Sequence, residues 1–215
     1  MQRVTKVFRY LNSTPDLGPI FDSDEGPILY GYSDASLNNH FNGRSHAGSF
    51  VCIGKNSAAI AAHSRMITSC VALSSMEAEY IALSELSRTI IYMRNFLADI
   101  GFPQSKPTVI FEDNASAIHL ASSSNIPVKS WHILLRYHFI KFAIESGAVE
   151  IHYINSENQR ADCLFSPWKR IPSKSIKTFA ILSYFETHLI FTLTFQLFPT
   201  WGEKGWVFVF RMSIS

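Results

Sequence analysis

The sequence predicts an α/β fold in which a five-stranded mixed sheet is flanked by helices. Three short strand patterns follow one another between residues 28 and 67 and are joined by polar stretches, which indicates an antiparallel unit. A long amphipathic helix pattern comes next, and helical patterns separate the two later strands. Because those later strands are reached through helices, we expect them to join the first three in one mixed sheet.

The strand patterns are short and rich in apolar or aromatic residues. They cover residues 28–35, 48–54, 58–67, 108–113 and 149–155. The stretch Gly54-Lys55-Asn56 between the second and third strands is a hairpin signal. The sequence contains no internal repeat.

The clearest helix begins after Ser74. Apolar residues recur every three or four positions from Met76 to Leu97, and Gly101 is expected as the residue just past its end. With Ser74 as N-cap, Glu77 falls at the third helical position and forms a capping box. Glu79 lies about 200° around the helix from Glu77 and points elsewhere. By itself, Glu79 fits either a solvent-facing boundary or a partly buried position.

Four further helical patterns are shorter. They cover residues 3–13 before the first strand, 114–123 and 131–147 between the last two strands, and a final helix that begins within 158–165.

Composition describes a globular protein, with 47% hydrophobic and 17% charged residues. The net charge of +2 is too small to argue for or against a polyanionic partner. Cys52, Cys70 and Cys163 are widely spaced, so neither a disulfide framework nor a structural zinc site is expected. The N-terminus has no apolar signal-peptide core, and we expect an intracellular, non-secreted protein.

Residues 169–215 differ from the rest because aromatic residues are frequent and no clean helical or strand period is present. The longest apolar stretch, LIFTLTFQLF, is about half of the roughly 20 residues needed to span a bilayer. One interpretation is a membrane-surface or partner-binding segment. The interpretation we favour is sequence never selected to fold, such as read-through into non-coding DNA. We therefore expect no membrane partner.

Three aspartates stand where strands end or a helix begins. Asp34 ends the first strand, Asp113 ends the fourth, and Asp162 lies in the first turns of the helix after the last strand. Each alone is explained by turn or capping preferences. Together with Glu79, however, they could converge on one side of the sheet. Such a cluster repels itself unless cations neutralise it, and hard oxygen ligands favour Mg²⁺ or Mn²⁺.

Seven local strings follow one another along the chain: RYLNSTPDLG, GYSDAS, VALSSMEAEYIALSE, LADIGFP, FEDNASAI, RYHFIK and QRADCLFSP. These strings, which occur in the family's order, resemble the ribonuclease H region of copia-type retrotransposon Pol polyproteins. The resemblance covers about residues 3–168. It implies a ribonuclease H-like domain at 24–168 and, at 1–23, the end of the connection that follows the reverse transcriptase. No polymerase, integrase or protease region is present, so the resemblance implies a truncated piece that formerly acted beside its reverse transcriptase.

The resemblance also implies a mechanism. In ribonucleases H four carboxylates bind two divalent ions, Mg²⁺ or Mn²⁺, which cleave the RNA strand of an RNA–DNA hybrid. By analogy Asp34 bridges both ions, Asp162 assists the ion that activates water, and Glu79 and Asp113 hold the other. Candidate contacts to the hybrid are Arg44, Ser45, Asn114 and Arg136.

Several positions depart from the family pattern. Ser36 and Leu37 replace the usual acidic residue and tryptophan, residues 131–134 read Trp-His-Ile-Leu in place of Lys-His-Ile-Asp, and the similarity ends after LFSPW. The loop before Asp162 lacks the family's histidine, and His152 is expected to be structural. Two alternatives therefore stay open. One is a catalytically silent nucleic-acid-binding remnant, and the other is an interaction domain whose partner docks on the aromatic tail. The oligomeric state is not predicted.

Overall fold

The computed structural model describes residues 26–37, 44–68, 70–123, 131–165, 194–202 and 205–213, together with Thr5, Arg9, Asn12, Ser13 and Phe21. Most of the helix expected at residues 3–13, and most of the segment 1–23, lie outside these residues.

Five strands form one mixed sheet, as predicted. They are β1 (Leu29–Ser36), β2 (His46–Ile53), β3 (Ala59–Met66), β4 (Thr108–Glu112) and β5 (Val149–Tyr153). The strand order is β3-β2-β1-β4-β5. The pairs β1–β2 and β2–β3 are antiparallel, whereas β1–β4 and β4–β5 are parallel. The predicted antiparallel unit of the first three strands is therefore confirmed.

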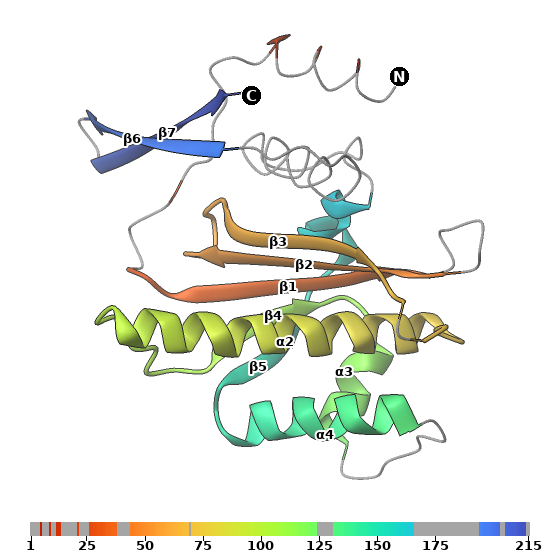
Figure 1. Cartoon of the computed structure of the whole chain (residues 1–215). Helices are drawn as coiled ribbons and strands as arrows, with labels where there is room; N and C mark the ends of the chain where they lie inside the picture. Colours follow the sequence, from red (N-terminus) through yellow and green to blue (C-terminus); the bar gives the residue numbers. More distant parts are fainter. Residues whose placement is uncertain are drawn as a thin grey trace.

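One face of the sheet is covered by α2 (Ser75–Asp99), α3 (Ala115–Ser122) and α4 (Trp131–Glu145). α2 runs across the sheet and also packs on α4 (Figure 1). This side of the sheet holds the larger core, whose bulkiest fully buried members include Tyr80, Leu86, Ile110, Tyr137 and Ile140. The apolar stripe predicted for the long helix is therefore the surface that meets the sheet.

The opposite face carries a smaller core beneath η2 (Ala161–Leu164). It contains Tyr32, Phe50 and Phe111 from the strands and Cys163 and Leu164 from η2. A regular final helix was expected here, but up to Phe165 the chain forms two short 3₁₀ turns, η1 (Ser156–Asn158) and η2. Between them Gln159 has an extended backbone, with φ −68° and ψ 111°, which prevents one continuous helix.

The ends of α2 follow the predicted signals. The Ser74 side chain accepts a hydrogen bond from Glu77 N at 3.2 Å, and Glu77 Oε2 accepts one from Leu73 N at 2.7 Å. The glutamate thus caps one residue further back than a standard capping box requires. At the other end Gly101 has a φ of +91°, and Phe102 N donates to Leu97 O at 2.7 Å. This is the Schellman pattern that favours glycine at this position.

Gly31 allows α2 to lie close to β1. A Cβ atom at this position would lie 2.7 Å from Ile90 Cδ1 and 3.2 Å from Leu86 Cδ2. Because real Cβ atoms do not approach other atoms as closely as 2.7 Å, a side chain here would force the buried methyl group of Ile90 to move. The missing side chain thus lets the middle of α2 pack closely on β1.

Two strands occur in the aromatic tail, where the sequence pattern predicted no regular structure. β6 (Thr194–Gly202) and β7 (Gly205–Ser213) pair antiparallel as a two-stranded sheet separate from the five-stranded one. The prediction that residues 169–215 lie outside the main domain stays a prediction. Among the helices of the described ranges, none combines the length and the apolar character needed to cross a bilayer.

Candidate metal centre

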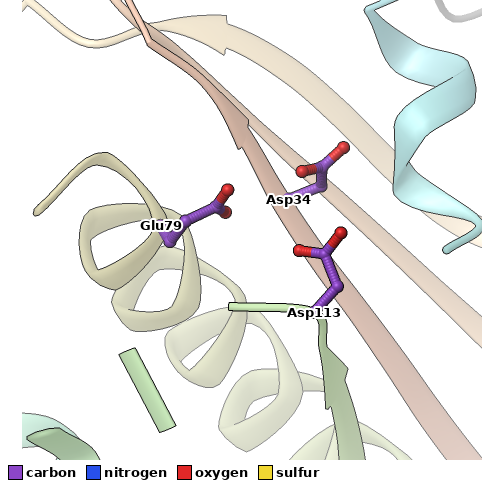
Figure 2. A group of neighbouring side chains, drawn as sticks. All are labelled: Asp34, Glu79 and Asp113. Carbon is purple, nitrogen blue, oxygen red and sulfur yellow. The ribbon is translucent and has the colours of Figure 1, made fainter. Parts of the chain in front are cut away.

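Three of the predicted carboxylates meet at one end of the sheet. One ligand oxygen from each of Asp34, Glu79 and Asp113 lies within 4.8 Å of the other two. Figure 2 shows the three side chains converging from β1, from α2 and from the residue that follows β4. Asp34 and Glu79 are 7% and 6% exposed, and Asp113 is half-buried. A small cation held here would meet oxygen ligands only, the set that Mg²⁺ and Mn²⁺ prefer.

The topology explains this convergence. β1 and β4 are parallel neighbours, so their carboxyl ends lie at the same edge of the sheet. Their backbone ladder ends at the pair Tyr32 and Phe111, and the two aspartates each follow two residues later. Glu79, near the start of α2, accepts a hydrogen bond from the backbone of Ala35 and so reaches the same edge.

Asp162 is linked to the group through Asp34. It comes from η2, and its side chain shares a hydrogen bond with the carboxyl of Asp34. Asp162 is also the strongest charge acting on Asp34, ahead of Asp113. Asp34 is therefore the carboxyl that interacts with each of Asp162, Asp113 and Glu79.

Burial and mutual repulsion disfavour the charged forms of these groups. Burial, followed by the charges of Asp162 and Asp113, raises the pKa of Asp34 to about 8. Burial, followed by the charge of Glu112, raises the pKa of Glu79 to about 10. Glu79 Oε2 is buried and has no hydrogen-bond partner among the described residues. A buried carboxylate oxygen left without a partner is costly, and a bound cation would satisfy it. The donor set therefore fits a divalent ion.

Comparison with known proteins places this site in a family. No protein-family model matches the chain. The chain is 32% identical over 163 residues to the retrovirus-related Pol polyprotein from transposon TNT 1-94 of Nicotiana tabacum, an alignment covering 76% of this chain and 12% of that polyprotein. It is 30% identical over 167 residues to the Pol polyprotein from transposon RE2 of Arabidopsis thaliana, covering 77% of this chain and 11% of the relative. The chain belongs to the retrotransposon Pol family. It spans only about an eighth of the length of these relatives.

The five-stranded mixed sheet agrees with the fold class that the sequence predicts. The assignment of the aligned part to the ribonuclease H region of a copia-type polyprotein stays a prediction. Among solved structures, LC11-RNase H1 isolated from compost gives a TM-score of 0.48 at 16% identity, covering 63% of this chain and 91% of that one. The N-terminal RNase H domain of rv2228c from Mycobacterium tuberculosis gives a TM-score of 0.44 at 14% identity, covering 62% of this chain and 86% of that one. The family assignment rests on the sequence relatives.

Two residues of this Pol-derived site were missed by the sequence analysis. Glu112 is fully buried directly before Asp113, and burial raises its pKa to about 8. Ser156 Oγ donates to Asp113 Oδ2 at 2.6 Å and orients that carboxylate. Side chains alternate along a strand, so Glu112 must face away from Asp113 and towards the helices. That alternation was the available signal for Glu112, whereas no sequence pattern pointed to Ser156.

The predicted hybrid contacts have different surroundings. Arg44 is half-buried, and its guanidinium donates to Thr68 O at 3.3 Å. Arg136 is half-buried and lies 3.8 Å from Glu85. The Asn114 side chain caps α3 by accepting hydrogen bonds from Ser116 N and Ala117 N.

Ser45 corrects the expectation of a surface contact. It is only 1% exposed, and its carbonyl accepts a hydrogen bond from Ile67 N at 2.8 Å. Ser45 is buried because the pairing of β2 with β3 begins at the next residue, His46. Its side chain is therefore not available to a nucleic acid in this conformation.

His152 lies within β5, where a structural role was expected. Its Nε2 is 2.7 Å from Glu150 Oε1, and its ring meets Phe111 edge-on. Both contacts stay on the sheet surface. The structural role of His152 stays a prediction.

Proposed function

We propose that residues 24–168 hydrolyse the RNA strand of RNA–DNA hybrids at the carboxylate cluster. The observation that carries the proposal is the convergence of Asp34, Glu79 and Asp113 within 4.8 Å, with Asp162 beside the first of them. The Pol relatives support the proposal, because the motifs of this chain resemble the ribonuclease H region of such polyproteins.

Two divalent ions, when bound, supply an activated water and stabilise the departing 3′ oxygen of the scissile phosphate. Asp34, which interacts with Asp162 and lies close to Glu79 and Asp113, would help to hold both ions. Asp162 would help to hold the ion that activates water, and Glu79 and Asp113 would hold the other ion. Ser156 holds the Asp113 carboxylate in place, and Ala35 N does the same for Glu79. Because Asp34 and Glu79 are buried, their electrostatic effect on the phosphate is less screened than at a surface.

Recognition of the substrate would involve two kinds of contact. Discrimination between RNA and DNA requires contacts to the 2′-hydroxyl groups, which only the RNA strand carries. Phosphate contacts from Arg44 and Arg136, with Asn114 beside the site, would add affinity that falls as salt is raised. In the intact polyprotein the reverse transcriptase would supply the hybrids that this domain consumes.

Cleavage of an end-labelled RNA–DNA hybrid tests the proposal. The parent chain, Asp34→Asn and Asp99→Asn are compared in Mg²⁺, in Mn²⁺ and in EDTA. Asp99 is an exposed residue at the end of α2, so its variant makes the same charge change away from the site. We expect metal-dependent cleavage of the RNA strand by the parent and by Asp99→Asn, and none by Asp34→Asn.

A different result would select the second function. If the folded parent binds the hybrid but leaves it intact in both metals, catalysis is excluded. The chain would then be a catalytically silent nucleic-acid-binding remnant, and the departures from the family pattern at Ser36 and Leu37 would agree with that function.

A further inference from the structure

A buried polar network lies directly beneath the carboxylate cluster. The parallel ladder of β1 and β4 ends at Tyr32 and Phe111, so the next residues, Ser33 and Glu112, have no backbone pairing with each other. Their side chains join instead: Ser33 Oγ donates to Glu112 Oε2 at 2.5 Å. Both residues are fully buried. The side-chain bond therefore replaces the ladder at the point where the two strands separate.

The same network extends in both directions. Glu112 Oε1 accepts a hydrogen bond from Asn114 N at 3.2 Å, which fixes the turn around Asp113. Gln159, 6% exposed, donates from Nε2 to Ser33 O at 2.8 Å and accepts at Oε1 from Ala161 N at 3.3 Å. One continuous set of hydrogen bonds thus joins the ends of β1 and β4 to the start of η2.

Each of the three aspartates is preceded by a member of this network. Ser33 comes directly before Asp34 and Glu112 directly before Asp113. The third, Asp162, directly follows Ala161. A shift in any of these hydrogen bonds would therefore move an adjacent aspartate. Mutating a group that orients a metal ligand typically lowers metal affinity by about tenfold to a hundredfold.

A buried carboxyl at position 112 is costly if its only role is to fill space. Burying such a group costs free energy, and similarly shaped apolar residues often stabilise a fold more. The nearby acidic groups add repulsion, since Asp113 lies next in the chain and Glu79 is affected by Glu112 more than by any other charge. The free-energy cost of burying Glu112 is explained if this residue determines the geometry of the metal ligands.

We propose that Glu112, through Ser33 and Gln159, is a positioning residue that sets the spacing of the aspartates for divalent-ion binding. This proposal rests on the proposed function, because it concerns the ions of the same site. In this role Glu112 acts through its hydrogen-bond partners and not as a metal ligand.

Calorimetric titration of the metal-free chain with Mn²⁺ tests the proposal. Glu112→Leu removes the network, Gln159→Met removes only its connection to η2, and Glu112→Gln keeps an acceptor for Asn114 N and a partner for Ser33. Thr108→Val is the matched control, because Thr108 is also buried and hydrogen-bonded in β4 but at the opposite end of the strand. The unfolding midpoint without metal is measured for each variant, so that lost affinity is separated from lost fold.

We expect Glu112→Leu and Gln159→Met to weaken Mn²⁺ binding about tenfold or more while each chain stays folded. Glu112→Gln and Thr108→Val should bind within about threefold of the parent. If Glu112→Leu fails to fold, the folded Gln159→Met variant decides by the same criterion. A folded variant with the parent's affinity would overturn the proposal, because the network would then support the fold alone. If the parent binds Mn²⁺ no better than Asp34→Asn does, the proposed function fails and this proposal fails with it.

Discussion

Glu77 and Glu79 stand two residues apart on α2 and meet opposite environments. Glu77 Oε2 accepts a hydrogen bond from Leu73 N outside the helix, whereas Glu79 is 6% exposed and its Oε2 has no partner within the described structure. The first carboxylate satisfies the helix end, and the second faces Asp34 and Asp113. Glu77 therefore contributes to the stability of α2, whereas Glu79 belongs to the carboxylate cluster.

Replacing Glu77 should affect stability and leave metal binding unchanged. Glu77→Ala removes the acceptor of Leu73 N, and we expect a loss of about 0.5–1 kcal/mol in the free energy of unfolding. Urea denaturation measures the loss, and the increase in stability on adding Mg²⁺ should equal that of the parent. A variant that loses this response to Mg²⁺ would contradict the assigned capping role.

Replacing Glu79 should have the opposite effects. Glu79→Gln removes a buried, repelled carboxylate, so the metal-free chain should become more stable by about 1 kcal/mol or more near pH 8. The stabilisation by Mg²⁺ should shrink at the same time, because one ligand is lost. Thermal unfolding with and without Mg²⁺ gives both quantities. An unchanged response to Mg²⁺ would remove Glu79 from the ligand set.

The stability of the metal-free chain should fall as pH rises. The pKa of Asp34 is raised from 3.8 to about 8 in the fold, so the folded state holds a proton that the unfolded chain has already released. Its contribution to stability is complete below about pH 4 and is lost as pH rises towards 8. Chemical denaturation in EDTA should therefore give a lower unfolding free energy near pH 8 than near pH 5.

Divalent ions should oppose this loss, because they favour the charged carboxylates. Added Mg²⁺ should stabilise the chain more near pH 8 than near pH 5. Asp34→Asn should weaken both the pH dependence of metal-free stability and the pH dependence of the stabilisation by Mg²⁺. A metal-free chain whose stability rises over the same range would show that burial does not hold these carboxyls protonated.

The contact between α2 and β1 can be tested at Gly31. In Gly31→Val the new Cβ would lie 2.7 Å from Ile90 Cδ1, and we expect a loss of about 1–3 kcal/mol from overpacking. Ala61→Val on the edge strand β3, where the residue is half-buried, should change stability by less than about 0.5 kcal/mol. Equal effects of the two substitutions would indicate that α2 does not depend on the missing side chain.

The sequence allowed most of the sheet and three members of the cluster to be predicted. The antiparallel unit followed from three short strands with polar connections, and α2 from an apolar stripe with recognisable ends. The four carboxylates were chosen because they end strands or begin helices, and because their strings resemble a family. The structure brings Asp34, Glu79 and Asp113 together and sets Asp162 against Asp34.

Other features depended on contacts between distant parts of the chain. The final helix was expected to be regular, but Gln159 bonds to Ser33 O and its backbone is extended. Ser45 lies in the polar stretch between the first two strand patterns, yet strand pairing next to it buries it. Glu112 was overlooked because its role depends on Ser33, a residue far away in the sequence.

The most direct test of the account is the chemistry of the ends left by cleavage of a hybrid. Water attacking the phosphorus with departure of the 3′ oxygen leaves a 3′-hydroxyl and a 5′-phosphate. We predict these ends for RNA fragments made by the parent chain in Mg²⁺, and no fragments from Asp34→Asn. Fragments ending in a 2′,3′-cyclic phosphate, or equal cleavage by Asp34→Asn, would contradict a metal-dependent carboxylate site.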